Sequence, residues 1–301
     1  MAVLRASDPT NPFARVDLVP PSFSYEQFPS TDLIPTRTRS VSVCLPARDE
    51  SATVAAIVGA LAGLQSEGLI DQLVVVDDSE DDTAALAEAA GAEVYDQSLL
   101  MPQFGPVLGK GDAMWRALSV LHGDVIVFLD ADTEDFPPHF VCGLLGPILA
   151  STDPASFVKA SYRRPLRVGE MLFPTGGGRV TDLTARPLLR RFFPALAGMR
   201  QPLAGEIAAD AGLLRALPFR TGYGVDVGVL IDALLAVGPE GLAQVDLGAR
   251  LNRHQPLAAL HDMACEVSDT ILDRSSRMLS EGVVERPPMA SVLPSDLVAA
   301  S

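Results

Sequence analysis

Short apolar runs alternate with amphipathic helical patterns from Ser42 to Asp132, and this alternation constrains the fold more than any other feature. The apolar runs include residues 40–46, 72–77 and 124–129. The helical patterns between them place apolar side chains on one face, as with Val54, Ile57, Val58 and Leu61. Strands that alternate with helices form mainly parallel sheets. We therefore expect an α/β fold with a Rossmann-like, mainly parallel sheet flanked by helices.

Polar clusters follow three of these apolar runs: "PARDE" at 46–50, "DDSEDD" at 77–82 and "DAD" at 130–132. Ligands of open parallel sheets bind beyond the carboxyl ends of the strands. Two adjacent carboxylates at the edge of a core are costly unless they are neutralised. The D-x-D of Asp130 and Asp132 indicates a Mg²⁺ or Mn²⁺ site that holds a nucleotide diphosphate. Neutralisation by nearby Lys or Arg, or exposure in a loop, are the alternatives.

Two glycine-containing segments supply candidate anion contacts. "GKGDAMW" places Lys110 between two glycines before a helical pattern, so Lys110 is either a phosphate contact or a surface lysine. "TGGGRVTDL" at 175–183 joins three glycines to Arg179 and Thr181 ahead of a predicted helix, whose first N–H groups favour an anion. Arg163 and Arg164 could contact the same anion. The alternative for the glycine segment is a loop with a capping glycine.

Composition excludes several classes of protein. The formal net charge of −15 argues against binding to nucleic acid or to anionic membranes. The absence of G-x-x-x-x-G-K-[ST], and of G-x-G-x-x-G after the first strand, argues against a P-loop and a dinucleotide-binding enzyme. Three widely spaced cysteines argue against a disulfide framework. No run approaches the roughly 20 apolar residues of a membrane helix, so we expect a cytoplasmic protein.

The chain resembles the actinobacterial glucosyl-3-phosphoglycerate synthases, a family that includes the related mannosyl-3-phosphoglycerate synthase. The resemblance extends from Ser42 to Leu260 and rests on "LPARDE", "GKGDAMWRAL", "VFLDADT", "YRRPL", "TGGGRVTDLTARPLL", "QPLAGE", "YGVDVGVLID" and "QVDLGARLNRHQPL". It implies a retaining glycosyltransferase of the GT-A fold. We expect four segments: an N-terminal arm at 1–38, a nucleotide-sugar-binding half at 39–133, an acceptor-binding half at 134–282, and an irregular tail at 283–301.

The resemblance also implies roles for individual residues. The implied donor contacts are Pro46, Ala47, Glu50, Ser79, Lys110, Asp130 and Tyr223. The implied acceptor contacts are Arg164, Gly178, Arg179, Val180, Thr181 and His254. Lys110, Asp130 and Asp226 are the implied catalytic residues, and Asp132 is the implied ligand of Mg²⁺ or Mn²⁺.

Two positions depart from the family pattern. Asp226 stands where the family has Glu after Tyr-Gly-Val. Asn252-Arg253-His254 stands where the family has His-Arg-Asn with its His on the metal. Either Asn252, through its carbonyl oxygen, or His254, after a local shift, would complete the metal site.

The implied reaction is glucose transfer from an NDP-glucose to the 2-hydroxyl of 3-phosphoglycerate with retention, carried out by a homodimer. The alternatives are mannosyl-3-phosphoglycerate synthesis from GDP-mannose, a nucleotidyltransferase that releases pyrophosphate, and a weakened relative that binds nucleotide sugar without turnover.

Overall fold

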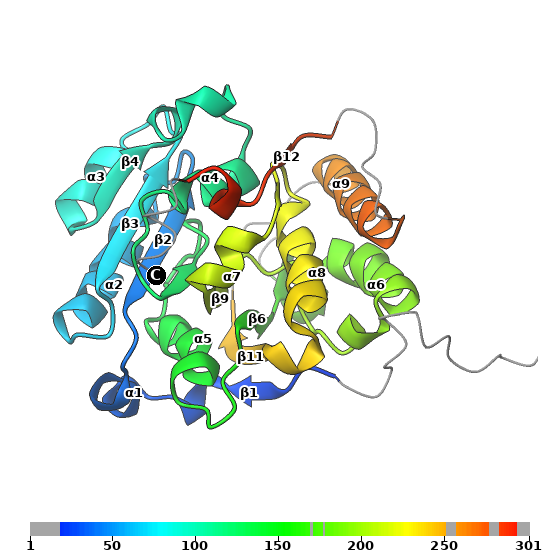
Figure 1. The fold of residues 1–301 in the computed structure, drawn as a ribbon, viewed down its shortest axis with the longest axis horizontal. Helices are drawn as coiled ribbons and strands as arrows, with labels where there is room; N and C mark the ends of the chain where they lie inside the picture. Colours follow the sequence, from blue (N-terminus) through cyan, green and yellow to red (C-terminus); the bar gives the residue numbers. More distant parts are fainter. Residues whose placement is uncertain (1–18, 169–170, 177, 251–256, 277–282, 294–301) are drawn as a thin grey trace, which may run out of the picture.

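A twisted eight-stranded sheet runs through the computed structural model, which describes residues 19–168, 171–176, 178–250, 257–276 and 283–293 (Figure 1). The strand order is β1 (Ser22–Ser24), β11 (Leu242–Ala249), β6 (Phe157–Arg163), β9 (Ile207–Asp210), β5 (Val125–Phe128), β2 (Val41–Ala47), β3 (Gln72–Asp77) and β4 (Glu93–Asp96). β9 runs antiparallel to β5 and β6, and the other neighbours in the sheet are parallel. The predicted fold class, an α/β fold with a mainly parallel sheet, is confirmed.

Helices cover both faces of the sheet. One face packs against α1 (Ser30–Thr36), α2 (Val54–Ser66), α3 (Thr83–Ala90) and α5 (His139–Leu149). The other packs against α4 (Lys110–Ala117), α6 (Arg186–Phe192), α7 (Ala211–Ala216), α8 (Val225–Val237) and α9 (Leu257–Ser276). Strand β2 has apolar side chains on both faces of the sheet. Val43 and Leu45 pack into the core on the side of α2, and Cys44 packs into the core on the side of α4. A strand buried on both faces reads as a continuous apolar run.

Smaller elements complete the chain. β7 (Pro165–Val168) and β8 (Met171–Gly176) form a hairpin that leads into a π-helical turn at Thr181–Ala185 and then into α6. β10 (Phe219–Arg220) pairs with β12 (Glu285–Arg286). β12 and a 3₁₀ turn at Met289–Ser291 lie in the segment expected to be an irregular tail. Its regular structure was missed because a two-residue strand is too short to show a hydrophobic period.

The sheet also joins segments that the sequence separates. β5 belongs to the predicted donor half and pairs with β9 of the predicted acceptor half, so both halves share one sheet. β1, in the predicted N-terminal arm, adds to the edge of the sheet beside β11.

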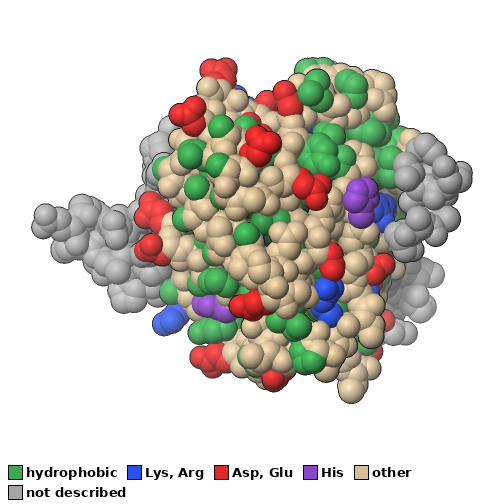
Figure 2. Space-filling view, turned by 90° about the vertical axis from the view of Figure 1, so that its left-hand side faces the viewer, with side chains coloured by type: hydrophobic (Ala, Val, Ile, Leu, Met, Phe, Trp, Pro, Cys, Tyr) green, Lys and Arg blue, Asp and Glu red, His purple; other side chains and the backbone are tan. Residues whose placement is uncertain are grey.

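The surface agrees with the acidic composition. Figure 2 shows the face seen from the left of Figure 1, where Asp and Glu side chains are scattered and Lys and Arg side chains are sparse. On this face there is no basic patch of the kind that binds nucleic acid. Within the described residues, no helix is both long enough and apolar enough to cross a membrane.

Candidate functional site

A pocket of about 650 Å³ opens at the edge of the sheet where the parallel strands end. Because all parallel strands point toward this edge, residues that follow different strands meet there. The predicted site residues that line the pocket are Pro46, Ala47, Glu50, Lys110, Asp130, Asp132, Arg164, Gly178, Arg179, Val180, Thr181, Tyr223 and Asp226. The structure therefore brings the donor, acceptor and metal predictions together in one cavity.

Three predicted site residues are not among those that line the pocket. The Ser79 hydroxyl donates to Asp77 Oδ1 at 2.6 Å and accepts from the Asp49 backbone N–H at 2.8 Å. Ser79 thus holds the segment after β3 against the segment after β2. The predictions for Asn252 and His254 lie outside the described residues.

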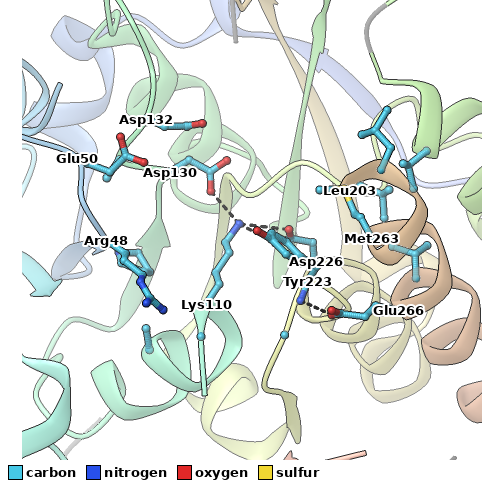
Figure 3. A pocket seen from close by; sticks show the side chains of 18 of the residues that line it. Arg48, Glu50, Lys110, Asp130, Asp132, Leu203, Tyr223, Asp226, Met263 and Glu266 are labelled. Carbon is cyan, nitrogen blue, oxygen red and sulfur yellow. Dashed lines mark hydrogen bonds and ion pairs between the residues drawn. The ribbon is translucent and has the colours of Figure 1, made fainter. Parts of the chain in front are cut away.

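Lys110, the first residue of α4, projects across the pocket between two carboxylates (Figure 3). Its Nζ lies 2.8 Å from Asp130 Oδ1 and 3.2 Å from both oxygens of Asp226. The following glycine is required by close packing, since a Cβ at Gly111 would lie 1.7 Å from the Arg220 carbonyl oxygen. Gly111 therefore lets the start of α4 approach β10.

The charges around Lys110 decide its protonation. Burial lowers the pKa of Lys110, but attraction to Asp130 and Asp226 outweighs burial and raises that pKa overall. Lys110 is therefore a fixed cation at neutral pH. Burial raises the pKa of Asp226. Behind the pocket, Lys159 donates from Nζ to the Asp226 carbonyl at 2.8 Å, and burial lowers the pKa of Lys159 to about 8.

Arg250, at the end of β11, holds the acidic residues of the sheet edge together. Its Nη2 donates to Asp132 Oδ1 at 2.6 Å and its Nη1 to Asp130 Oδ2 at 3.1 Å. The same Nη1 donates to Glu206 and, at 3.1 Å, to the Tyr162 hydroxyl, and that hydroxyl donates to Glu206 Oε2 at 3.0 Å. Arg250 is buried. One guanidinium thus connects three carboxylates.

Lys110 and Arg250 supply the positive charge that the D-x-D sequence needs at the edge of the core. Burial raises the pKa of Asp130, but Lys110 and Arg250 outweigh burial and hold that pKa well below its usual range. Nearby basic side chains therefore neutralise Asp130 within the protein itself. Asp132 differs, because 45% of its side chain remains exposed at the pocket.

Arg250 and Glu206 were missed as site residues by sequence reasoning. Arg250 directly follows β11, so the pattern of polar residues after strands, which predicted Asp130 and Asp132, applies to Arg250 as well. Glu206 precedes β9, and it reaches the same edge because β9 runs antiparallel to its neighbours. That reversal has no signal in the hydrophobic pattern.

The donor chemistry at Asp132 fits a divalent cation. Carboxylate oxygens are preferred ligands of Mg²⁺ and Mn²⁺. Asp132 presents such a group to the pocket with almost half of its side chain exposed. No group of three or more His, Cys, Asp and Glu suited to a metal occurs within the described residues. The part of the site that is described therefore offers Asp132 as a ligand, without a complete protein cage.

Another part of the pocket lining combines cations with a glycine turn. Gly178 has a φ of 79°, a left-handed conformation that favours glycine. Arg179 and Arg164 line the pocket beside it, and the Arg164 guanidinium lies 5.6 Å from the centre of the Tyr162 ring. Two guanidinium groups at one wall suit a phosphate or a carboxylate.

The end wall of the pocket is partly apolar (Figure 3). Leu203, Leu260, Met263 and Val267 contribute to it. The Tyr223 backbone N–H donates to Glu266 Oε2 at 2.7 Å, which anchors the turn before α8 on α9.

The comparisons with known proteins agree with this geometry. The family described as "Glycosyl transferase family 2" matches residues 42–185. Glucosyl-3-phosphoglycerate synthase of Mycolicibacterium smegmatis is 41% identical over 277 residues, which cover 85% of this chain and 91% of that relative. The chain belongs to the glucosyl-3-phosphoglycerate synthase family. The expected resemblance and the glycosyltransferase class are thus confirmed.

Solved structures of the glucosyl-3-phosphoglycerate synthase family and its relatives share the fold. Mannosyl-3-phosphoglycerate synthase from Rubrobacter xylanophilus has a TM-score of 0.83 and 43% identity, and the match covers 91% of this chain and 96% of that one. Glucosyl-3-phosphoglycerate synthase from Mycobacterium tuberculosis, in complex with Mn²⁺, UDP-glucose and phosphoglyceric acid, has a TM-score of 0.82 and 38% identity. That match covers 92% of this chain and 100% of that one. The GT-A fold is therefore confirmed.

Proposed function

We propose that this protein transfers glucose from UDP-glucose to the 2-hydroxyl of 3-phosphoglycerate, with retention at the anomeric carbon. The observation that carries the proposal is that Asp130 and Asp132 of the D-x-D sequence line the same pocket as the guanidinium groups of Arg164 and Arg179. The first suits a nucleotide diphosphate with its metal, and the second suits a small dianionic acceptor. Relatives named glucosyl-3-phosphoglycerate synthase at 41–45% identity support it.

On the donor side, Pro46, Ala47 and Glu50 at the end of β2 receive the nucleoside. Asp130, Lys110 and Tyr223 contact the diphosphate and the sugar. Ser79 supports the nucleoside end from outside the pocket lining, through its bonds to Asp77 and Asp49.

Asp132 would hold Mg²⁺ or Mn²⁺, together with Asn252 or His254. When bound, such an ion supplies positive charge that stabilises the leaving diphosphate. The exposed carboxylate of Asp132 supports this assignment. Structures of the Mycobacterium tuberculosis enzyme with UDP and Mn²⁺ or Mg²⁺ support the presence of a divalent metal.

On the acceptor side, Arg164, Arg179, Thr181 and the backbone of Gly178 and Val180 hold the phosphate and carboxylate of 3-phosphoglycerate; His254 is a further predicted contact outside the described residues. Anchoring both anionic groups holds the 2-hydroxyl against the anomeric carbon, which contributes through proximity.

The chemical step relies on electrostatics more than on a nucleophile. Lys110 remains protonated because its pKa is raised, so it provides charge and does not act as a base. Asp130 and Asp226 fix the direction of its ammonium group. The leaving phosphate oxygen accepts the proton of the acceptor hydroxyl as the new glycosidic bond forms on the same face.

A product assay tests this function. UDP-glucose, 3-phosphoglycerate and Mg²⁺ together should yield glucosyl-3-phosphoglycerate with the anomeric configuration of the donor, as judged by the anomeric coupling constant in proton NMR. An inverted product, or product formed without 3-phosphoglycerate, would contradict the proposal. Arg179→Ala should raise the KM for 3-phosphoglycerate more than the KM for UDP-glucose.

A second candidate is mannosyl-3-phosphoglycerate synthesis from GDP-mannose. The observation that favours it is the 43% identity to the Rubrobacter xylanophilus mannosyl-3-phosphoglycerate synthase. Comparing kcat/KM for UDP-glucose and GDP-mannose at fixed 3-phosphoglycerate distinguishes the two.

The proposal includes a cytoplasmic homodimer. The buried, free thiols of Cys44 and Cys142 support a reducing compartment. Family membership supports the dimer, and light scattering of the purified protein measures it. A monomer at micromolar concentration would contradict that part of the proposal.

A further inference from the structure

Residues 284–287, which we call the C-terminal strap, cross from the side of α9 to α4 (Figure 1). The strap contains β12, and its register with β10 pairs Arg286 with Phe219 and Glu285 with Arg220. It lies about a hundred residues beyond the match to the glycosyltransferase family, which ends at residue 185.

Arg286 of the strap is buried against the start of α4. Its Nε donates to Asp112 Oδ1 at 2.6 Å, and Asp112 is a fully buried carboxylate two residues after Lys110. Asp112 Oδ2 accepts from the Leu108 backbone N–H at 3.1 Å. Arg286 Nη1 also donates to the Phe104 carbonyl at 2.6 Å. Arg286 therefore ties the first turn of α4 and the loop that precedes it to the strap, beside Arg116 of α4, which pairs with Asp112 Oδ2 at 2.8 Å.

Trp115 of α4 also contacts the strap. Its Nε1–H donates to the Pro287 carbonyl at 2.7 Å, and the Arg286 guanidinium lies 5.5 Å from the centre of the indole ring. Trp115 is the one tryptophan of the chain. Its fluorescence consequently reports the docking of the strap without interference from other tryptophans.

The strap also reaches α8, the helix that carries Asp226. Glu285 Oε1 accepts from Arg274 at 2.6 Å, and Arg274 in turn pairs with Asp232 of α8 at 2.7 Å. The Val284 carbonyl accepts from the Thr221 hydroxyl at 3.1 Å, and Thr221 lies four residues before the first residue of α8, Val225. The strap thus contacts α4 directly and α8 through Arg274. The first turns of these two helices carry Lys110 and Asp226.

We propose that the C-terminal strap sets the position of Lys110 relative to Asp226 and Asp130, with Arg286 as the positioning residue. A buried ion pair contributes little net stability but constrains geometry through its hydrogen bonds. Arg286 has three acceptors on α4 and its preceding loop, counting the weaker bond to the Pro106 carbonyl at 3.3 Å. This inference rests on the proposed function only for the role of Lys110 in transfer.

The test compares Arg286→Gln with Val284→Thr, a control on the same segment. Val284 contacts Thr221 through its backbone carbonyl and its side chain is exposed, so the control leaves the strap docked. Far-UV circular dichroism verifies folding of each variant. Arg286→Gln should shift the Trp115 emission to longer wavelength and lower kcat by about tenfold to a hundredfold, because a misplacement of about 1 Å costs up to roughly that much. The KM for 3-phosphoglycerate should stay within about twofold of the wild-type value. Partial unfolding would instead impair both kcat and the binding of 3-phosphoglycerate.

Calorimetric titration of UDP with Mg²⁺ separates this inference from the proposed function. If the wild-type protein transfers no glucose, the proposed function fails, and weaker UDP binding by Arg286→Gln than by Val284→Thr still supports the strap. A folded Arg286→Gln with wild-type kcat and wild-type UDP affinity would overturn the inference. If Arg286→Gln does not fold, Arg286→Lys takes its place, because an ammonium keeps the charge beside Asp112 but cannot supply the guanidinium bonds to the Phe104 and Pro106 carbonyls as well. Unchanged kcat and UDP affinity in that variant would overturn the inference equally.

Discussion

Arg250 Nη2 lies 2.6 Å from Asp132 Oδ1, and the Nη1 of the same guanidinium lies 3.1 Å from Asp130 Oδ2. Both aspartates of the D-x-D sequence are therefore bound to one buried cation, which also contacts Glu206. Because Glu206 is buried as well, removing the guanidinium would leave its carboxylate without its principal counter-charge.

Arg250→Met should lower the free energy of unfolding by ~3–5 kcal/mol, the usual cost of breaking a buried pair. Arg200→Met is the matched control, because Arg200 pairs with Asp246 at 3.0 Å on the surface, with side chains 59% and 39% exposed. That change should cost less than ~1 kcal/mol. Urea unfolding measures both. Equal losses in the two variants would contradict the importance assigned to the Arg250 cluster.

Gly205 lies so close to Asp130 that any side chain at this position should disturb the Asp130 carboxylate. A Cβ at this position would lie 2.0 Å from Asp130 Oδ1, so Gly205→Ala must displace that carboxylate. We expect kcat/KM for the sugar nucleotide to fall by about 10²-fold. Gly212→Ala is the control, since a Cβ there meets nothing within 4 Å. Steady-state rates check both, and full activity of Gly205→Ala would show that the position of Asp130 is not critical.

Lys159 should make stability depend on pH. Burial lowers its pKa to about 8, below the ordinary value of 10.5 expected in the unfolded chain. Between these values the unfolded state binds more protons, so the free energy of unfolding should rise with pH, by up to ~1.4 kcal/mol per unit. Lys159→Met lacks this contribution. Urea unfolding at several pH values across this window should show the wild type gaining on the variant as pH rises; parallel curves would contradict the buried lysine.

Asp132→Asn should weaken the binding of Mn²⁺ with UDP by at least about tenfold, equivalent to ~1.4 kcal/mol, because a neutral amide replaces the carboxylate. Asp135→Asn is the control, because Asp135 is exposed and does not line the pocket, and Asn tolerates its φ of 49°. Titration calorimetry measures both affinities. Equal affinity of the two variants would remove Asp132 from the metal site.

Much of the pocket was predictable from where polar residues follow apolar runs. Asp130 and Asp132 after β5, and Glu50 after β2, meet at one edge because parallel strands share a direction. Lys110 and Arg179 were found through their glycine-rich surroundings, which the structure explains at Gly111 and Gly178 by close approach and by a positive φ.

The remainder depended on tertiary pairing that leaves no local pattern. Glu206 reaches the site only because β9 inserts antiparallel between β5 and β6. Arg286 enters the core through a contact with Asp112, which lies 174 residues earlier in the chain. α5 (His139–Leu149) is apolar on nearly every face, so it gives no amphipathic period from which its helical structure could be predicted.

The most direct test of the proposed transfer is the initial rate of UDP release, measured with UDP-glucose, 3-phosphoglycerate and Mg²⁺ present together and with each omitted in turn. We predict rapid release only in the complete mixture, its loss when a chelator removes the metal, and its return when Mg²⁺ is restored. No release from the complete mixture, or release of pyrophosphate from UTP and glucose 1-phosphate instead, would contradict the proposed transfer.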